Sequence, residues 1–431
     1  MLPRSAFGLL AAMVCAGSMW FYVQRIMIPH QAAEDAARNR PRGSFSDLYP
    51  RWLGARELLL RQRDPYSQEI TREIQEGYYG RALDPARAED PKDEQRFAYP
   101  VYVVFLLAPT IGLSFHTVQL GFFWFLVVLT LVSVWLWLRA VQWRASLATM
   151  GILAALTLGS FPAVQGLKLQ QLSLLVNGML ALCAVALGCG QLFAAGALLA
   201  LATIKPQLTA PLVAWLMLWS VSRWRERKSL VFGFGFAMAA LLVGAEWVLP
   251  GWMGEFREGL AAYQRYTGGA QSMLEVLTTP WAGKVLSVAL LAWAAWVCWR
   301  ARQARAESRE FVLATSLLLA VTVVTLPKLA PYNQALLLPA IFLLVKDWRS
   351  WSGQGRAARM LGWIAAAALF WPWIAAAGMS MGLLFVPAMM VQRAWAVPLY
   401  TSVWLPLAVV MLLGLEVRFR PASNPAIPAK A

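Results

Sequence analysis

Residues 118–138 read VQLGFFWFLVVLTLVSVWLWL, an apolar run without a single charged side chain. A helix needs roughly 20 such residues to cross the hydrocarbon core of a bilayer. In lipid, the backbone N–H and C=O groups must find their hydrogen-bond partners within the protein, which a helix achieves along its own length. This run therefore predicts a transmembrane helix.

The composition extends this prediction to the whole chain. Of its 431 residues, 59% are hydrophobic and only 14% are charged, whereas about 25% of residues are charged in an average soluble protein. The 22 tryptophans fit a membrane protein as well, because indole rings favour the membrane–water interface. We expect an all-α fold, a polytopic membrane helix bundle.

Apolar runs of suitable length recur along the chain and predict about twelve transmembrane helices. The first lacks a small-residue cleavage site, so we expect it to remain attached, with a cytoplasmic N-terminus. The expected helices lie at 1–23, 99–114, 118–138, 147–164, 172–187, 191–220, 230–249, 281–299, 311–326, 335–345, 360–377 and 396–415.

The chain therefore divides into four parts. A first transmembrane helix at 1–23 precedes a polar extracytoplasmic segment at 24–98, and the remaining bundle covers 99–420. The tail at 421–431 is rich in Pro and Ala, which predicts disorder.

The positive charge lies in the short loops of the bundle. The formal net charge is +16, yet segment 24–98 holds 13 basic and 13 acidic residues and is neutral. With a cytoplasmic N-terminus, the loops expected inside carry 14 basic residues, and those expected outside, including 139–146, carry 6. Basic loops mark the cytoplasmic side of a multi-pass protein. We expect a plasma-membrane protein of the bacterial inner-membrane type that binds no nucleic acid.

Cysteine and histidine are too few and too scattered for most metal or nucleophile chemistry. The four cysteines all fall within apolar runs, and the two histidines, His30 and His116, lie far apart in sequence. No zinc-ligand spacing, disulfide framework or phosphate-cradling glycine loop is present. The sequence predicts neither a cofactor nor a metal.

The polar segment contains the stretch SFSDLYPRW at 44–52. Leu48, Trp52, Ala55 and Leu59 recur at helical spacing and predict an amphipathic helix lying in the membrane interface. Asp47 falls at its first turn. Two interpretations stay open: Asp47 caps the helix, or it is a general base that takes a proton from a hydroxyl group at the membrane surface.

Two further polar positions follow. The tripeptide DPY at 64–66 is typical of a helix stop and a turn, and Asp64 is kept as a candidate substrate-binding residue. Lys205 lies near the middle of the expected helix 191–220, next to Pro206. A charge at that depth is costly. Lys205 either reaches the interface as a structural group or binds an anionic group of a lipid substrate, such as a phosphate.

Two polar interruptions complete the list of candidates. The stretch QGLKLQQ at 165–171 lies on the cytoplasmic side by span count, so it is either an ordinary loop or a re-entrant turn that reaches a buried cavity. The loop at 325–334 falls on the exported side. There, Lys328, Tyr332 and Asn333 either contact a sugar or phosphate or serve as interfacial anchors.

Several motifs occur in a fixed order along residues 47–339. They are DLYPRW at 47–52, DPY at 64–66, FAYP at 97–100, LQQLSLLV at 169–176, IKP at 204–206, and PYNQ at 331–334 followed by LLLP at 336–339. This ordered set resembles glycosyltransferase family 87, the polyprenol-phosphate-mannose-using type of GT-C membrane enzymes. The chain differs from the family pattern at Gln170, where glycine is usual, at Ser173, where asparagine is common, and at Val101, where a second proline is frequent.

The resemblance implies a GT-C fold with its active site at the extracytoplasmic surface. It implies transfer of a sugar, with mannose expected, from a polyprenyl-phosphate donor to a glycolipid or glycan acceptor, with inversion and with Asp47 as the base. Lys205, helped by arginines of the first loop or by Lys328, is the candidate for the donor phosphate. Gln171 and Tyr99 fall within the matching motifs and are candidate substrate-binding residues.

Two other functions remain open on the sequence. A lipid-linked saccharide flippase or transporter would be expected to show several intramembrane charges or inverted repeats, whereas Lys205 is the single charge deep in an expected span. An O-antigen ligase or polymerase would be expected to carry its large polar loop late in the chain. Here the large polar segment comes early, at 24–98.

Overall fold

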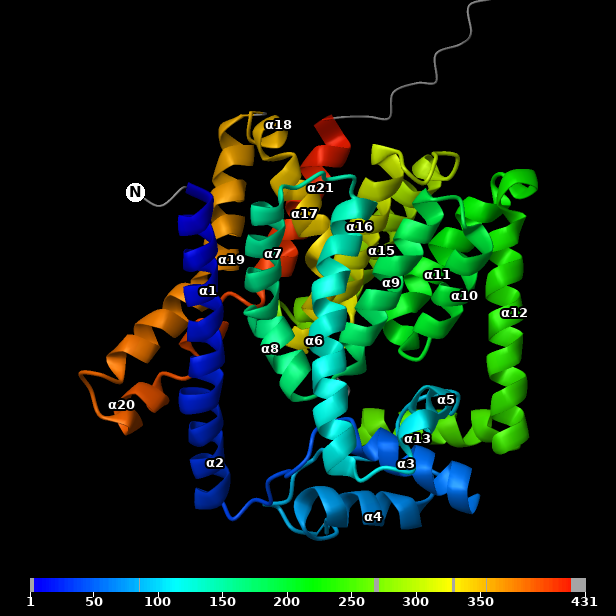
Figure 1. Ribbon diagram of the computed structural model, residues 1–431, viewed down its shortest axis with the longest axis vertical. Coiled ribbons are helices and arrows are strands. Elements are labelled where there is room, and N and C mark those ends of the chain that lie inside the picture. The colour runs from blue at the N-terminus through cyan, green and yellow to red at the C-terminus, as the bar shows by residue number, and fades with distance from the viewer. Residues whose placement is uncertain (1–3, 85, 267–270, 328–329, 354, 420–431) are drawn as a thin grey trace, which may run out of the picture.

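The computed structural model describes residues 4–419, apart from 85, 267–270, 328–329 and 354. The tail at 421–431 lies outside the described residues. Within them the chain forms helices and no strand (Figure 1), so the all-α prediction is confirmed. Besides the helices introduced below, the chain contains α13 (Trp252–Tyr266), α14 (Met273–Leu277), α15 (Pro280–Ala301), α16 (Arg309–Thr325), η3 (Pro331–Leu337), α17 (Leu338–Lys346), α18 (Trp348–Ser352), α19 (Arg356–Gly382), α20 (Ala388–Arg393), η4 (Val397–Leu399) and α21 (Trp404–Phe419).

Six helical stretches in the described part of the chain are long and apolar enough to cross a membrane. A seventh is added if α7 (Leu147–Leu158) and α8 (Phe161–Lys168), which are bent by 58° at their junction, count as one. The protein is thus a multi-pass membrane protein, and the expected number of twelve is not confirmed. The six are Ser5–Ala37, Phe115–Ala140, Trp224–Val248, Pro280–Ala301, Arg356–Gly382 and Ala388–Arg418.

The expected transmembrane helix at 99–114 is wrong. Its residues form the five-residue helix α5 (Val103–Leu107) and the short η2 (Ala108–Thr110). Pro100 precedes α5 and Pro109 lies within η2, and proline disfavours the helical conformation of the residue before it. The segment therefore turns within the end of the bundle instead of crossing it.

The loss of this crossing reverses the position of loop 139–146. The Lys346 Nζ donates to the Val141 carbonyl at 2.9 Å, and the Gln142 side-chain amide donates to the Glu307 carbonyl. Loop 139–146 therefore lies with the basic loops and not, as expected, on the opposite side. Figure 1 shows α18 and the end of α21 at the top of the bundle and segment 24–98 at the bottom. The basic loops and the polar segment occupy opposite ends.

The long helix expected at 191–220 is broken at Lys205. α10 (Leu192–Ala202) and α11 (Pro206–Val221) flank the break, and Lys205 is the N-cap residue of α11. Proline is well placed at the first position of a helix, where its missing N–H costs nothing. Lys205 therefore lies at a junction between two helices and not in the middle of one, which turns its side chain toward the interior of the protein.

Residues 165–171 do not lie with the basic loops, at the end of the bundle where the span count had put them. They include the end of α8, a tight turn and the N-cap of α9 (Leu172–Gly188). The Asp47 N–H donates to the Leu169 carbonyl at 3.1 Å, so the turn meets segment 24–98 directly. The prediction of a turn that reaches a buried site is the one that the structure supports.

Segment 24–98 is a small helical layer beneath the bundle (Figure 1). α1 (Arg4–Tyr22) continues through the π-helix η1 (Val23–Met27) into α2 (Ile28–Ala37), and α3 (Tyr49–Arg61) and α4 (Gln68–Tyr79) follow. The amphipathic helix expected after Asp47 is present as α3. However, Leu48, Trp52 and Ala55 are buried against protein, including α5, so a location in the membrane interface is not confirmed.

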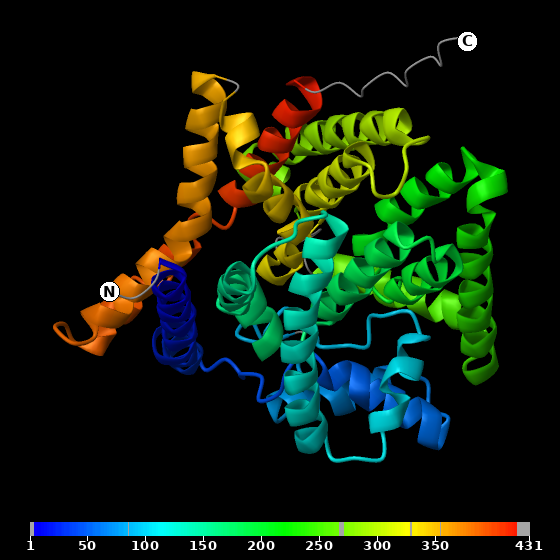
Figure 2. The ribbon, with the colours of Figure 1, turned by 45° about the horizontal axis from the view of Figure 1, so that its top comes forward.

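The bundle has two flanks. Figures 1 and 2 both place α1 and α19 on one side and α12 (Trp224–Val248) on the other. Between them, α6 (Phe115–Ala140) packs against α9, and α9 packs against α10. This central group lies above segment 24–98 in Figure 1, and the turn that precedes α9 meets that segment through the bond from the Asp47 N–H to the Leu169 carbonyl.

Candidate active site

A large cavity of about 1210 Å³ lies between segment 24–98 and the bundle. One part of its lining is formed by residues of the polar segment and the following turn, and the rest by helix junctions of the bundle together with α13, α14 and α15. Six of the candidate residues identified in the sequence, from five separate stretches of the chain, line it: Asp47, Tyr99, Gln171, Lys205, Tyr332 and Asn333.

Asp47 does not cap the helix that follows it. α3 starts at Tyr49, its N-cap residue is Leu48, and no side chain caps it. Instead, the Asp47 carboxylate accepts a hydrogen bond from the Gln171 side-chain amide. Because its N–H is also bound to the Leu169 carbonyl, both the backbone and the side chain of Asp47 are fixed by the 169–171 turn.

A hydrogen-bond chain connects Asp47 to the cation in the cavity. The Lys205 Nζ donates to the Gln171 Oε1 at 2.9 Å and to the Ser173 Oγ at 2.7 Å. The Ser173 hydroxyl donates in turn to the Asn333 Oδ1 at 2.8 Å. A single amide, that of Gln171, therefore bonds the carboxylate with its nitrogen and the ammonium with its oxygen.

Aromatic rings surround the cations of the site. The Lys205 Nζ lies 5.2 Å from the centroid of the Tyr332 ring and 5.8 Å from that of Tyr99, and the Arg51 guanidinium carbon lies 4.7 Å from the Tyr99 centroid. Ring faces attract cations without neutralising them. Among the described residues no carboxylate forms a salt bridge with Lys205, which is 5% exposed. The site therefore has positive charge to offer an anion.

Arg51 adds a second cation beside Asp47. It belongs to the first turn of α3, and its guanidinium donates to the Asp47 carbonyl. Its buried Nε has no hydrogen-bond partner among the described residues. A buried donor without a partner costs free energy. Arg51 lines the cavity, so its guanidinium adds positive charge there.

Gln170 holds the turn that carries Gln171. Its φ angle of 50° lies in the left-handed region, which glycine adopts without strain. The Gln170 side chain accepts a hydrogen bond from the Ser46 hydroxyl and donates one to the Gln119 carbonyl. These bonds offset the strain and tie the turn to both the polar segment and α6.

One predicted site residue among those described, Asp64, lies outside the cavity. The Asp64 Oδ1 accepts the Tyr66 N–H at 2.9 Å, which is the turn expected from the DPY motif, and Asp64 does not line the cavity. The turn that Asp64 stabilises is connected to the cavity through Tyr66, because the Tyr66 hydroxyl donates to the Tyr99 carbonyl at 2.6 Å. Lys328 lies outside the described residues.

Arg51, Ser173 and Asp93 are among the cavity or network residues that were not singled out from the sequence. Arg51 could have been found, because it lies four residues after Asp47 and so one helical turn away. Ser173 stood out only as a departure from the family pattern. Asp93 lines the cavity, but nothing in its sequence neighbourhood distinguishes it from the other acidic residues of segment 24–98.

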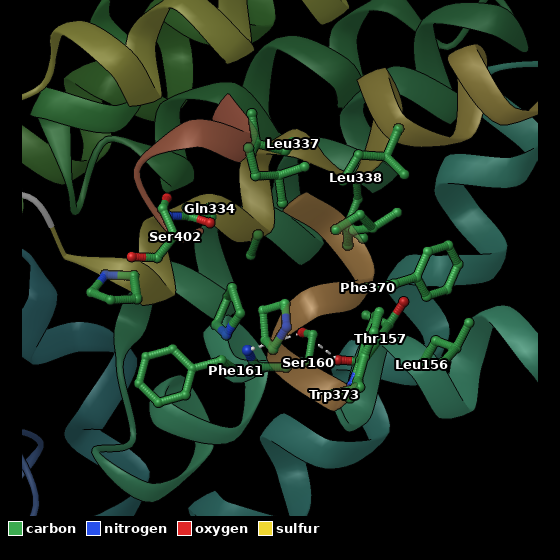
Figure 3. A pocket seen from close by; sticks show the side chains of 18 of the residues that line it. Leu156, Thr157, Ser160, Phe161, Gln334, Leu337, Leu338, Phe370, Trp373 and Ser402 are labelled. Carbon is green, nitrogen blue, oxygen red and sulfur yellow. Dashed lines mark hydrogen bonds between the residues drawn. The ribbon is translucent and has the colours of Figure 1, made fainter. Parts of the chain in front are cut away.

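A second cavity of about 200 Å³ lies on the other side of η3. Whereas Tyr332 and Asn333 line the large cavity, Gln334 and Ala335 line this smaller, mainly apolar crevice between α7, α8, α17, α19 and α21. Figure 3 shows Phe161 and Trp373 at one end, with Leu337 and Leu338 above them. The Gln334 amide donates to the Ser402 carbonyl at 2.7 Å, whereas the buried Thr401 Oγ1 has no hydrogen-bond partner among the described residues.

The large cavity combines a carboxylate base with a cation. Among the described residues, no group of three or more His, Cys, Asp or Glu side chains is placed to hold a metal ion. A carboxylate held near an acceptor hydroxyl can remove its proton, and fixed cations can stabilise negative charge that develops on a leaving group. This combination suits the transfer of a group from a phosphate.

Comparison with known proteins identifies a family. The model of glycosyltransferase family 87 matches residues 97–327, which is more than half of the chain. No curated protein and no solved structure matches. The matched region contains Tyr99, Gln171 and Lys205 and begins after Asp47, so the role of Asp47 is argued from the geometry of the site.

Proposed function

Since the chain belongs to glycosyltransferase family 87, and is therefore a glycosyltransferase, we propose that its donor is a polyprenyl-phosphate sugar, with mannose as the sugar. The acceptor is an extracytoplasmic glycolipid or glycan. The enzyme belongs to the GT-C type and inverts the configuration at the transferred carbon. The family match favours this function over the flippase and the ligase considered from the sequence.

The observation that carries this proposal is the Asp47–Gln171–Lys205 connection within one cavity. In the proposed reaction, an acceptor hydroxyl oxygen attacks the anomeric carbon of the donor sugar while the Asp47 carboxylate takes its proton. The bond between that carbon and the phosphate oxygen breaks, and polyprenyl phosphate leaves. Lys205 and Arg51 stabilise the negative charge on the departing phosphate.

Gln171 keeps the two charges apart and oriented. Under ordinary conditions an amide exchanges no proton with Lys205 or Asp47. Gln171 therefore fixes the positions of the two groups without transferring charge between them. The amide nitrogen bonds to Asp47 and the amide oxygen bonds to Lys205. One planar group therefore sets the distance between the base and the phosphate-binding cation. Because the groups are already oriented when the substrate binds, less entropy is lost in reaching the transition state.

The location of the cavity fits a lipid-linked donor. It lies at the end of the bundle opposite the basic loops, which is the extracytoplasmic end by the positive-inside rule. The apolar crevice behind η3 begins one residue away from Tyr332 in sequence. We place the isoprenoid chain of the donor there, with its phosphate at Lys205.

The test is a transfer assay with the purified protein in liposomes. Radiolabelled polyprenyl-phosphate-mannose is the donor and a total cell lipid extract supplies the acceptor. Asp47→Ala should abolish transfer, while Asp64→Ala, a matched change of a carboxylate outside the cavity, should keep most of it. Full activity in a folded Asp47→Ala variant would remove Asp47 from the mechanism.

A further inference from the structure

We propose that Asp93 binds the acceptor sugar, as a second carboxylate of the cavity with a role separate from that of Asp47. The inference rests on the proposed function, because it assigns the acceptor side of the same site. The chemical class of the ligand is a sugar with two neighbouring hydroxyl groups, which an ionised carboxylate can bind with its two oxygens.

Asp93 is held in place by α4. The Tyr79 hydroxyl donates to the Asp93 carbonyl at 2.8 Å, and the Gln75 side-chain amide donates to the carbonyl of the next residue, Glu94, at 3.0 Å. The Gln75 Oε1 also accepts the Leu83 N–H at 3.0 Å, so the two ends of the 83–94 loop are fixed to one buried side chain. The loop is irregular in form but anchored at the residue that lines the cavity.

Asp93 and Asp47 face the same region. Burial is the main cause of a raised pKa of the Tyr78 hydroxyl, and the negative charges of Asp47 and Asp93 raise it further. Both carboxylates also line the one cavity. The two carboxylates therefore belong to one cavity and lie near the same tyrosine.

The direction of the reaction separates their roles. In a displacement with inversion, the acceptor oxygen approaches from the face opposite the leaving phosphate. The acceptor hydroxyl lies at Asp47, which takes its proton, while the departing phosphate lies at Lys205 and Arg51. Asp93 lines the cavity from the same segment as Asp47, beside Gln95 and Arg96, and is therefore placed on the acceptor side of the reacting carbon.

The size of the cavity allows both substrates. Its volume of about 1210 Å³ exceeds the range of roughly 300–1,000 Å³ that is usual for the pocket of one small ligand. A donor sugar with its phosphate leaves room for an acceptor sugar beside Asp93. Asp93 is therefore expected to determine how tightly the acceptor binds, while Asp47 determines how fast it reacts.

Asp93→Asn is the decisive variant. The Asn side chain keeps an oxygen for the Gln95 N–H, which lies 3.3 Å from the Asp93 Oδ1, and the backbone bond from Tyr79 is unchanged, so the variant should fold. With octyl α-mannoside as acceptor and polyprenyl-phosphate-mannose as donor, the acceptor KM should rise about tenfold or more, as expected when hydrogen bonds to a charged group are weakened. The kcat should stay within about twofold and the donor KM should not change.

Glu89→Gln is the matched control, because it removes one negative charge from an exposed position of the same segment outside the cavity. It should leave all three constants unchanged. An unchanged acceptor KM in Asp93→Asn overturns the inference, and so does a collapse of kcat at an unchanged acceptor KM, which would make Asp93 part of the chemical step. If the wild-type protein transfers no sugar from the polyprenyl phosphate, the proposed function itself fails.

Discussion

Tyr332 and Asn333 line the polar cavity that holds Asp47, and the next two residues of η3, Gln334 and Ala335, line the apolar crevice beside Trp373. On the first side, charged and amide groups are connected by hydrogen bonds that run from Asp47 to Asn333. On the second side, the lining is mainly apolar, and the Gln334 amide and the Trp373 indole donate to backbone carbonyls.

The difference between the two cavities matches the two halves of a lipid-linked sugar. A phosphate and a sugar need cations and hydrogen-bond partners, because buried polar groups without partners are costly. An isoprenoid chain needs only apolar surface. One short helix that separates two such environments can hold the junction between the head group and the chain of the same substrate.

The largest effect is expected on the polar side, at the base. Asp47→Asn should lower kcat about 10²- to 10⁴-fold, the usual contribution of a general base, and should leave the donor KM nearly unchanged. Asp84→Asn, an exposed carboxylate of the same segment, is the control. Initial rates at several donor concentrations separate the two constants, and a lower affinity for donor at an unchanged kcat would contradict the role of Asp47 as base.

Next in size is the cation that holds the phosphate. Lys205→Met keeps the length of the side chain and removes its charge, so the donor KM should rise about tenfold or more. Lys284→Met is matched to it, because Lys284 also lines the cavity but is exposed. Donor kinetics identical to wild type in a folded Lys205→Met protein would remove Lys205 from the phosphate site.

The apolar side should respond to the length of the donor chain. Ala368 lines the crevice and is 5% exposed, so Ala368→Phe should fill it and raise the KM for a long-chain donor about three- to tenfold. A donor with a ten-carbon chain should be affected little. The control is Ala367→Phe, at the preceding residue of α19, which is exposed and outside the crevice. An equal effect on both donors, or on the acceptor alone, would show that the crevice does not hold the donor chain.

The smallest effects should distinguish the neighbouring residues of η3. Asn333→Ala removes the acceptor of the Ser173 hydroxyl and should reduce kcat/KM a few-fold by loosening Lys205. Gln334→Ala removes its bond to the Ser402 carbonyl and should lower the free energy of unfolding by about 1 kcal/mol with activity unchanged. Activity assays and thermal melts of both variants test these expectations. A loss of activity in Gln334→Ala with none in Asn333→Ala would contradict the assignment of the two residues to different cavities.

Much of the site could be predicted from the sequence. The order of the motifs pointed to Asp47, Gln171, Lys205 and the 331–334 stretch, and the structure brings these together. The apolar runs predicted the all-α membrane bundle. Their composition alone could not show that 99–114 turns back, since the effect of Pro100 and Pro109 depends on the protein packed around them. That one error placed loop 139–146 at the wrong end of the bundle.

Other features depend on contacts between distant segments. Gln171 faces Asp47 only because the 169–171 turn folds down onto residue 47, and a count of spans had placed that turn on the other side. Lys205 was expected inside a helix, but the break before Pro206 makes it the N-cap of α11. Asp93 owes its position to Tyr79 and Gln75 of α4. No local pattern records such contacts.

The central claim is that one cavity holds the donor phosphate at Lys205 and the reacting carbon at Asp47. It is tested most directly by a cryo-EM structure of the Asp47→Asn variant with polyprenyl-phosphate-mannose. The prediction is a phosphate within hydrogen-bond distance of the Lys205 Nζ, with the anomeric carbon facing position 47 and the isoprenoid chain in the crevice behind η3. A phosphate bound elsewhere, with Lys205 still bonded only to Gln171 and Ser173, would contradict it.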